Sequence, residues 1–184
     1  MNTVLLLVDI QNDYFPGGAM ELTGSPEAAL KGGHLLQAFR RQSLPVIHVQ
    51  HIANREGATF FLPGTPGAVI HERVAPLPGE LVITKHFPNS FRDTELLEQL
   101  QRLQPVQLVI AGMMTHMCID TTVRAAADLG FSCQLAHDAC ATKDLAFGGI
   151  TVPAPQVQVA YLAALNGLFA QVLAVDALCA TLAA

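Results

Sequence analysis

The chain has 184 residues, of which 51% are hydrophobic and 14% are charged, and its formal net charge is -5. These values fit one compact domain with a substantial core, which we expect to span residues 1–184. The charged residues form no basic block, so we expect a small-molecule substrate and no nucleic acid or membrane partner. No apolar run has membrane-spanning length and the four cysteines form no C-x-x-C pair, which predicts a reducing, cytoplasmic setting.

Short apolar runs alternate with longer segments of helical period along the chain. This alternation is typical of βα units that build a mostly parallel sheet with helices on both faces. Each short run is rich in valine, isoleucine or leucine, as expected for strands buried on both sides. The predicted strands are Thr3–Asp9, Pro45–Gln50, Leu81–Lys85, Leu108–Gly112, Ser132–Ala136 and Val172–Val175.

Helix signals lie between these strands. Ser25 is the expected N-cap of a helix that ends near Arg41, with proline at its first position. Thr94 is the expected cap of a second helix, and Gly130 is placed to end a third one in the left-handed conformation. The third helix should cover Ile119–Leu129, the fourth should run from about Gln156 to Leu168, and an alanine-rich helix should follow near the C-terminus. Residues 51–78, rich in proline and glycine, are predicted to be a long loop with one helical turn at most.

Polar residues close or follow three of the predicted strands. Ligands of open α/β sheets bind beyond the carboxyl ends of the strands, so these residues are the first functional candidates. Asp9 ends the first strand, Lys85 ends the third, and Cys118 follows the fourth across a turn. Each has an ordinary alternative, because an aspartate can cap a turn, a lysine can reach solvent and a buried cysteine can be inert.

The combination of these three residue types favours a reactive cysteine. Cys118 lies where the third helix should begin, so the free N–H groups and the dipole of that helix would favour the thiolate. Lys85 would add a cation that lowers the pKa of the thiol, and Asp9 would accept and return a proton. Because separate parallel strands deliver these groups to one edge of the sheet, we expect them to converge.

Three blocks of the sequence resemble a known family. They are Leu6–Phe15, Lys85–Phe91 and Ala111–Ile119, and in order and spacing they resemble the signature blocks of isochorismatase-like cysteine hydrolases. This family includes nicotinamidases and N-carbamoylsarcosine amidases, and the resemblance extends from residue 3 to about residue 175. It implies a three-layer α/β/α sandwich around a six-stranded, mostly parallel sheet.

The resemblance also implies a catalytic triad of Asp9, Lys85 and Cys118. It further implies a cis peptide bond between Met113 and Met114, and an oxyanion hole formed by the backbone N–H groups of Met114 and Cys118. The expected reaction is hydrolysis of a C–N bond in a small amide, carbamoyl compound, ureide or lactam through a thioester intermediate. A homo-oligomer is expected from the family.

Other functions and pocket residues remain open at this point. One alternative is a non-catalytic α/β binding or scaffold protein, and another is a vinyl-ether hydrolase of the isochorismatase type, although such relatives typically lack the cysteine. By position, Tyr14, His51 and Met117 are candidates for the wall of the substrate pocket. Ordinary core packing is the alternative for Tyr14 and Met117.

The seven histidines raise the question of a metal site. His48 and His51 are close in sequence, but residues three apart on a strand point to opposite faces. Metal-binding nicotinamidases carry Asp-x-His where this chain has His51-Ile52-Ala53, so that ligand motif is absent. Because a catalytic zinc site needs three well-placed ligands, we expect neither a metal nor another cofactor.

The remaining candidates have simpler interpretations. His86 follows Lys85 and is expected to be structural. Cys140, in a loop that approaches the same sheet edge, is the rival nucleophile but lacks a helix start at its position. Cys133 and Cys179 are expected in the core or in an interface.

Overall fold

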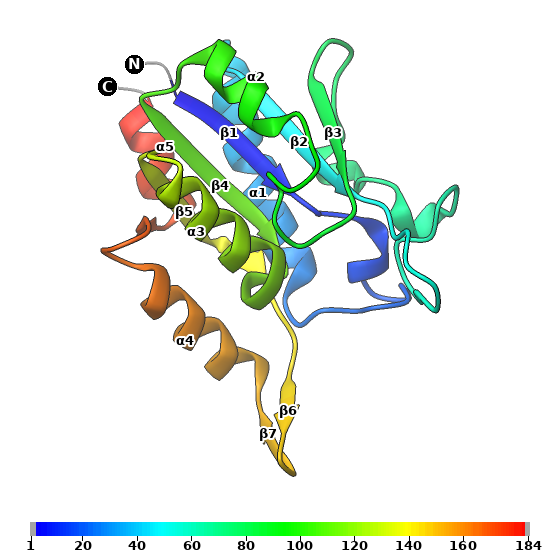
Figure 1. The fold of residues 1–184 in the computed structure, drawn as a ribbon. Helices are drawn as coiled ribbons and strands as arrows, with labels where there is room; N and C mark the ends of the chain where they lie inside the picture. The colour runs from blue at the N-terminus through cyan, green and yellow to red at the C-terminus, as the bar shows by residue number, and fades with distance from the viewer. Residues whose placement is uncertain (1–2, 183–184) are drawn as a thin grey trace.

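The computed structural model describes residues 3–182, and a parallel sheet forms its centre (Figure 1). Its six strands lie in the order β3-β2-β1-β4-β5-β8, and every neighbouring pair is parallel. They are β1 Thr3–Val8, β2 Val46–His51, β3 Leu81–Lys85, β4 Gln107–Met113, β5 Cys133–Ala141 and β8 Gln171–Leu173. The predicted six-stranded α/β architecture is confirmed.

Helices cover both faces of this sheet (Figure 1). One face packs against α1 Ser25–Arg41 and α5 Val175–Leu182. The other packs against α2 Leu96–Leu103, α3 Asp120–Asp128 and α4 Ala154–Leu165. None of the described helices is both long and apolar enough to cross a membrane.

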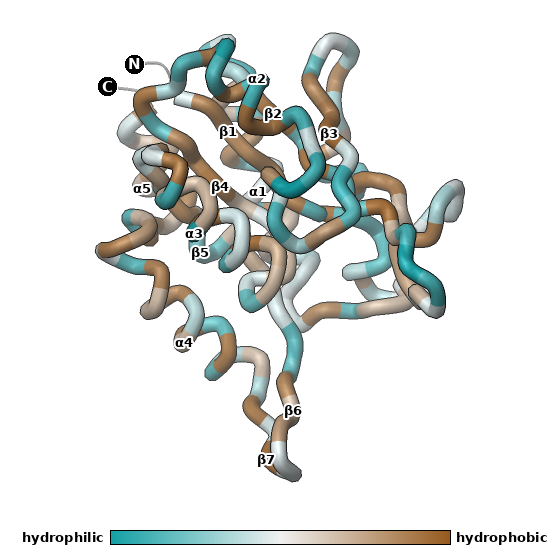
Figure 2. Tube along the Cα trace, in the orientation of Figure 1, coloured by the Kyte–Doolittle hydropathy of each residue, from teal (hydrophilic) through white to brown (hydrophobic). Residues whose placement is uncertain are grey.

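Strand β1 shows why the sheet lies between two helical layers. All six of its residues are buried, and its side chains alternate between the two faces. Leu5 and Leu7 belong to the core cluster on the α1 side, whereas Val4 and Leu6 belong to the cluster on the α2 and α3 side. Burying one such side chain contributes about 1.5–3 kcal/mol. The continuous apolar run therefore marks a strand with no solvent-facing side (Figure 2).

The junction after β4 depends on a glycine. Gly112 has φ of 142°, and a Cβ there would lie 2.0 Å from the carbonyl oxygen of Val8 on β1. Only glycine permits this approach of the two backbones. One residue further along, the peptide bond between Met113 and Met114 is cis, as expected.

Several predicted boundaries were wrong. Strand β5 extends to Ala141, so Cys140 lies on a strand rather than in a loop. Strand β8 ends at Leu173, and Val175 already begins α5. Ser25 is the first residue of α1 rather than its N-cap, because Gly24 takes the cap position with φ of 76° and the hydroxyl of Ser25 donates to the carbonyl of Leu22.

Two other helix signals lie at or next to the positions predicted for them. Thr94 lies one residue before the N-cap of α2, and its hydroxyl accepts a hydrogen bond from the N–H of Leu96. Gly130 has the expected positive φ of 88° after α3. The long loop contains two short 3-10 turns, Pro66–Ala68 and Glu72–Val74, rather than the single turn that was expected.

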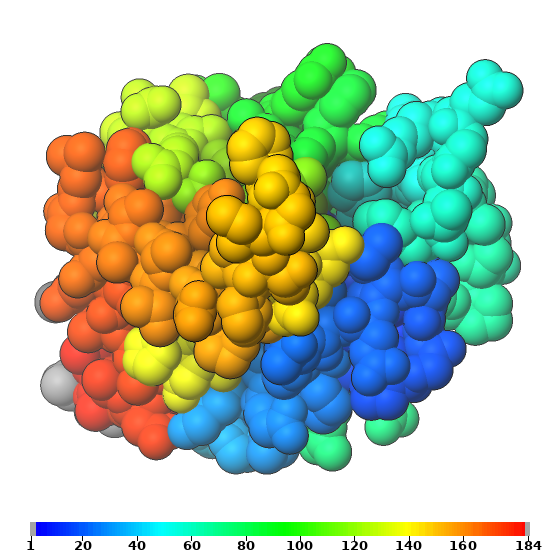
Figure 3. All heavy atoms as spheres, turned by 90° about the horizontal axis from the view of Figure 1, so that it is seen from below, coloured from blue at the N-terminus to red at the C-terminus, as the bar shows by residue number. Residues whose placement is uncertain are grey.

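A small hairpin was not predicted. Strands β6 Leu145–Phe147 and β7 Ile150–Val152 pair antiparallel and project from the body of the molecule (Figure 1). Seen from below, residues of this hairpin lie in front of the part of the surface formed by α4 (Figure 3). The expected single domain over residues 1–184 stays a prediction, and residues 1–2 and 183–184 lie outside the described part.

Candidate active site

Three buried side chains meet at the carboxyl edge of the sheet. Asp9 follows β1, Lys85 ends β3, and Cys118 lies in a π-helical turn, Thr115–Ile119, between β4 and α3. The ammonium of Lys85 lies 2.7 Å from Oδ2 of Asp9 and 3.2 Å from Sγ of Cys118. The convergence expected from the strand ends is therefore present, whatever its chemical role.

Backbone geometry directs two of these side chains to the site. Asp9 has φ of 53°, a left-handed conformation that non-glycine residues adopt infrequently, and it ends the extended course of β1. Its N–H still donates to the carbonyl of Val49 on β2. Lys85 is in register with His51 on the neighbouring strand β2, so the side chains of these two residues start one strand spacing apart.

The ammonium of Lys85 is fully enclosed by polar partners. Besides Asp9 and Cys118, it contacts Nδ1 of His51 at 3.0 Å and donates to the carbonyl of Phe87 at 3.1 Å. Burial alone lowers the pKa of Lys85, but the charge of Asp9 and the hydrogen bonds to Asp9 and Cys118 raise it above its ordinary value. This lysine is a permanent cation at neutral pH.

The thiol of Cys118 does not have the lowered pKa expected from the sequence. Burial and the neighbouring carboxylate of Asp9 raise the pKa of Cys118, and the lowering effect of Lys85 is smaller. The physical reason is that Asp9 already neutralises the lysine, so a thiolate would add an uncompensated negative charge to a buried cluster. The resting group is a thiol next to a carboxylate.

His51 is a neutral ring at the same place. Burial lowers its pKa to about 4, because the attraction of Asp9 does not offset the loss of solvent. An ammonium can only donate, so Nδ1 of His51 accepts from Lys85 and the proton of the neutral ring is on Nε2. The ring therefore offers one donor.

One group of side chains could in principle bind a metal ion. Ligand atoms of Asp9, His51 and Cys118 lie within 4.8 Å of one another. The ammonium of Lys85, however, lies 3.2 Å or less from one ligand atom of each of them, where a metal cation would have to be. His48 is not part of this group and pairs with Glu80 instead, at 2.9 Å. The donor set fits an internal ammonium better than a metal.

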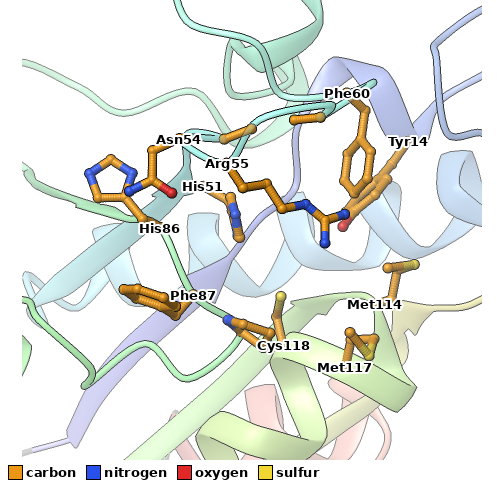
Figure 4. A pocket seen from close by; sticks show the side chains of 13 residues that line it. Tyr14, His51, Asn54, Arg55, Phe60, His86, Phe87, Met114, Met117 and Cys118 are labelled. Carbon is orange, nitrogen blue, oxygen red and sulfur yellow. The ribbon is translucent and has the colours of Figure 1, made fainter.

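A cavity of about 220 Å³ opens above Cys118 (Figure 4). The three pocket residues proposed from the sequence, Tyr14, His51 and Met117, all line it. Tyr14 is also a core residue, with its ring 4.6 Å from that of Phe61. The other lining residues are Ala53, Asn54, Arg55, Ala58, Phe60, His86, Phe87, Pro88, Met114 and Cys118.

Several of these residues were not predicted from the sequence to line the cavity. His86 was expected to be structural, yet it lines the cavity while Nδ1 of its ring hydrogen-bonds to the carbonyl of Ile52. Arg55 lies in the loop after β2, where no motif marks it. A general signal existed, because loops that follow the carboxyl ends of strands line ligand sites in such sheets.

The rival cysteine belongs elsewhere. Cys140 is buried in β5, and its thiol donates to the carbonyl of Ala136 at 3.3 Å. Burial raises its pKa to about 12, and it does not line the cavity above Cys118. Cys133 is buried and Cys179 half-buried, and all four cysteines are free.

The fold and this site correspond to one protein family. A family model described as isochorismatase domain matches residues 3–177, so the chain belongs to the isochorismatase family of hydrolases. It is 51% identical over 177 residues to the uncharacterized isochorismatase family protein YddQ of Bacillus subtilis, covering 96% of this chain and 98% of YddQ.

Other relatives extend this comparison. A crystal structure of an isochorismatase-family chain from Oleispira antarctica is 53% identical with a TM-score of 0.94, covering 97% of this chain and 96% of that one. A streptothricin hydrolase of Streptomyces noursei is 34% identical over 146 residues, which are 77% of this chain and 50% of that enzyme. The fold and the hydrolase family are thus established.

Proposed function

We propose that the protein hydrolyses a C–N bond of a small amide, carbamoyl compound, ureide or lactam, with Cys118 as the nucleophile. The observation that carries the proposal is the buried contact of Asp9 and Cys118 with one ammonium, directly below a cavity that the thiol lines. A non-catalytic binding protein has no need for a buried carboxylate, cation and thiol in contact, because burying such groups has a free-energy cost.

Asp9 is the proposed proton carrier in the first half of the reaction. It takes the proton of the Cys118 thiol as sulfur attacks the carbonyl carbon, so no free thiolate has to form in the resting enzyme. The raised pKa of the thiol, which is due to burial and to Asp9, fits this sequence of events. Asp9 then gives the proton to the nitrogen of the leaving group as the C–N bond breaks and the thioester forms.

Water completes the reaction. Asp9 takes a proton from water as its oxygen attacks the thioester carbon, the C–S bond breaks, and the sulfur recovers the proton. The backbone N–H groups of Met114 and Cys118 are the proposed oxyanion hole, since both residues line the cavity. Removal of one such donor typically costs about 100-fold or more in rate. Lys85 holds Asp9 and Cys118 in orientation through its two contacts, and it needs no proton transfer of its own.

The similarity to a streptothricin hydrolase supports a hydrolytic role. The presence of the cysteine distinguishes this proposal from vinyl-ether hydrolysis, for which a thioester has no use. A metal-free reaction, a cytoplasmic location and a homo-oligomer stay predictions.

A panel of small amides, ureides and lactams tests the proposal, with released ammonia, amine or acid as the measured product. Cys118→Ala should abolish turnover while circular dichroism and unfolding stay close to those of the wild type. Cys140→Ala is the matched control, because it removes a buried thiol outside the cavity and should leave turnover in place. Intact-mass spectrometry should detect an acyl adduct on the wild type during turnover. Comparable activity of Cys118→Ala would contradict a covalent mechanism.

A further inference from the structure

The cavity above Cys118 has an unpaired positive charge. Arg55 is the only arginine or lysine in its lining, and the lining contains no aspartate or glutamate. Among residues 3–182, no hydrogen bond or ion pair holds the guanidinium of Arg55, and Figure 4 shows it directed into the cavity beside Tyr14 and Phe60. The buried pair of Asp9 and Lys85 below is neutral as a whole.

The loop that carries Arg55 is fixed at its base. The N–H of Ala53 donates to the carbonyl of Phe61 at 2.9 Å, which closes the loop. The N–H of Phe61 donates to the buried carboxylate of Asp13 at 2.6 Å, which attaches the loop to the segment after β1. Arg55 is also close enough to His51 for its charge to add, as a minor cause after burial, to the lowered pKa of that ring. The base of the loop is therefore anchored, and the exposed side chain of Arg55 extends from it over the cavity.

We propose that Arg55 binds a carboxylate of the substrate, so that the enzyme acts on small amides that carry a carboxylate. This inference rests on the proposed function and names its substrate class. A guanidinium matches the two oxygens of a carboxylate with two parallel hydrogen bonds, and such charge-assisted bonds are the strong ones. Tyr14 lines the same cavity, where a tyrosine hydroxyl can act as a further donor.

The remaining walls limit the rest of the substrate. Phe60, Phe87 and Met117 line the cavity and give it apolar walls, which suit a short carbon chain. The cavity volume of about 220 Å³ lies below the range of roughly 300–1,000 Å³ typical for drug-sized ligands. A compact amide with one carboxylate fits this combination, because the charge would meet Arg55 while the amide carbon lies at Cys118.

Two alkylating reagents of nearly equal size test the anion site without requiring turnover. Iodoacetate carries a carboxylate and iodoacetamide does not. Both alkylate sulfur at their CH2 carbon, with loss of iodide and of the thiol proton. The rate of Cys118 labelling by each is measured by peptide mass spectrometry. Arg55→Gln should lower the ratio of the iodoacetate rate to the iodoacetamide rate by about 10- to 100-fold, the usual effect of a lost charge-assisted bond.

Arg102→Gln is the matched control, because Arg102 is an exposed residue of α2 that pairs with Glu98 and is not part of the cavity. Its rate ratio should equal that of the wild type. A ratio that changes by less than twofold in Arg55→Gln would overturn the inference. Failure of both reagents to reach Cys118 would overturn it as well, since the cavity would then not admit a carboxylate beside the thiol.

Turnover separates this inference from the proposed function. Succinamate and succinamide differ only in a carboxylate or an amide at the far end, and the wild type should favour succinamate in kcat/KM. An Arg55-dependent labelling ratio without amide turnover would leave the anion site intact and reject the proposed function. Cys118-dependent turnover that favours succinamide, in wild type and Arg55→Gln alike, would reject the anion site alone.

Discussion

The ammonium of Lys85 lies 2.7 Å from Oδ2 of Asp9, and neither side chain has any exposed surface. The two residues come from strands separated in the sheet by β2, so this contact exists only in the folded chain. Desolvation of two charges is costly, and the pair is tolerated because each member neutralises the other. The pair of Asp9 and Lys85 therefore affects both the stability of the protein and its proposed catalysis.

Removal of both charges should destabilise the protein by less than the sum of the two single removals. We expect Lys85→Met to lower the free energy of unfolding by about 3–5 kcal/mol, because it leaves the carboxylate buried without its cation. The double variant with Asp9→Asn should be less destabilised than the sum of the two single variants, with a coupling energy of about 1–3 kcal/mol. Urea unfolding of all four proteins gives this value. Additive effects would show that the pair does not interact.

Asp9→Asn should make the thiol of Cys118 more acidic and at the same time slow turnover. The carboxylate of Asp9 is, after burial, the main cause of the raised pKa of Cys118, so its neutralisation should lower the pH at which iodoacetamide labels this thiol. Turnover should nevertheless fall by about 100-fold or more, because the proton acceptor is lost. Asparagine tolerates the positive φ at this position. A labelling midpoint that moves to higher pH would contradict the charge balance described for the cluster.

Activity should not depend on a divalent metal. The ammonium of Lys85 takes the position between Asp9, His51 and Cys118 that an ion would need. Treatment with a strong chelator should leave the rate unchanged, and elemental analysis should find no stoichiometric zinc, iron or manganese. Loss of activity that one added divalent ion restores would show that these side chains are ligands.

Acid should weaken a second charged contact, remote from the active site. The guanidinium of Arg40, assisted by the N–H of Leu77 and by His48, lowers the pKa of Glu80 from 4.5 to about 2. A carboxylate with a lowered folded-state pKa stabilises the protein above pH 4.5, and this contribution is lost as the pH falls from there towards 2. Glu80→Gln should therefore cost about 1–3 kcal/mol near pH 7 and little near pH 2, as measured by urea unfolding.

Glu98 offers the comparison for that experiment. It forms an exposed pair with Arg102 on α2, and exposed pairs contribute about 0–1 kcal/mol. Glu98→Gln should have a small effect at both pH values. An equal loss for Glu80→Gln at pH 7 and pH 2 would show that packing rather than charge explains the role of Glu80.

Local sequence patterns predicted the α/β architecture and the edge of the sheet at which three polar groups meet. Continuous apolar runs such as Val4–Val8 can only be strands buried on both faces, and parallel strands end at a common edge. This is why Asp9, Lys85 and Cys118 could be grouped before their distances were known. The β6–β7 hairpin was not predicted, although Gly148 and Gly149 form a two-residue turn between its two short strands.

The sequence by itself determined which residue types reach the carboxyl edge of the sheet, because strand period and strand ends are local properties. Only the tertiary structure decided the charge state of Cys118, since burial and the Asp9–Lys85 pair act through space and outweigh the helix start that the sequence shows. It alone also placed the loop of Arg55 at the cavity, because Phe61 at the end of this loop bonds to Asp13, 48 residues away in the chain. Local patterns carry no information on electrostatic balance or on loop position, which depend on groups distant in the chain.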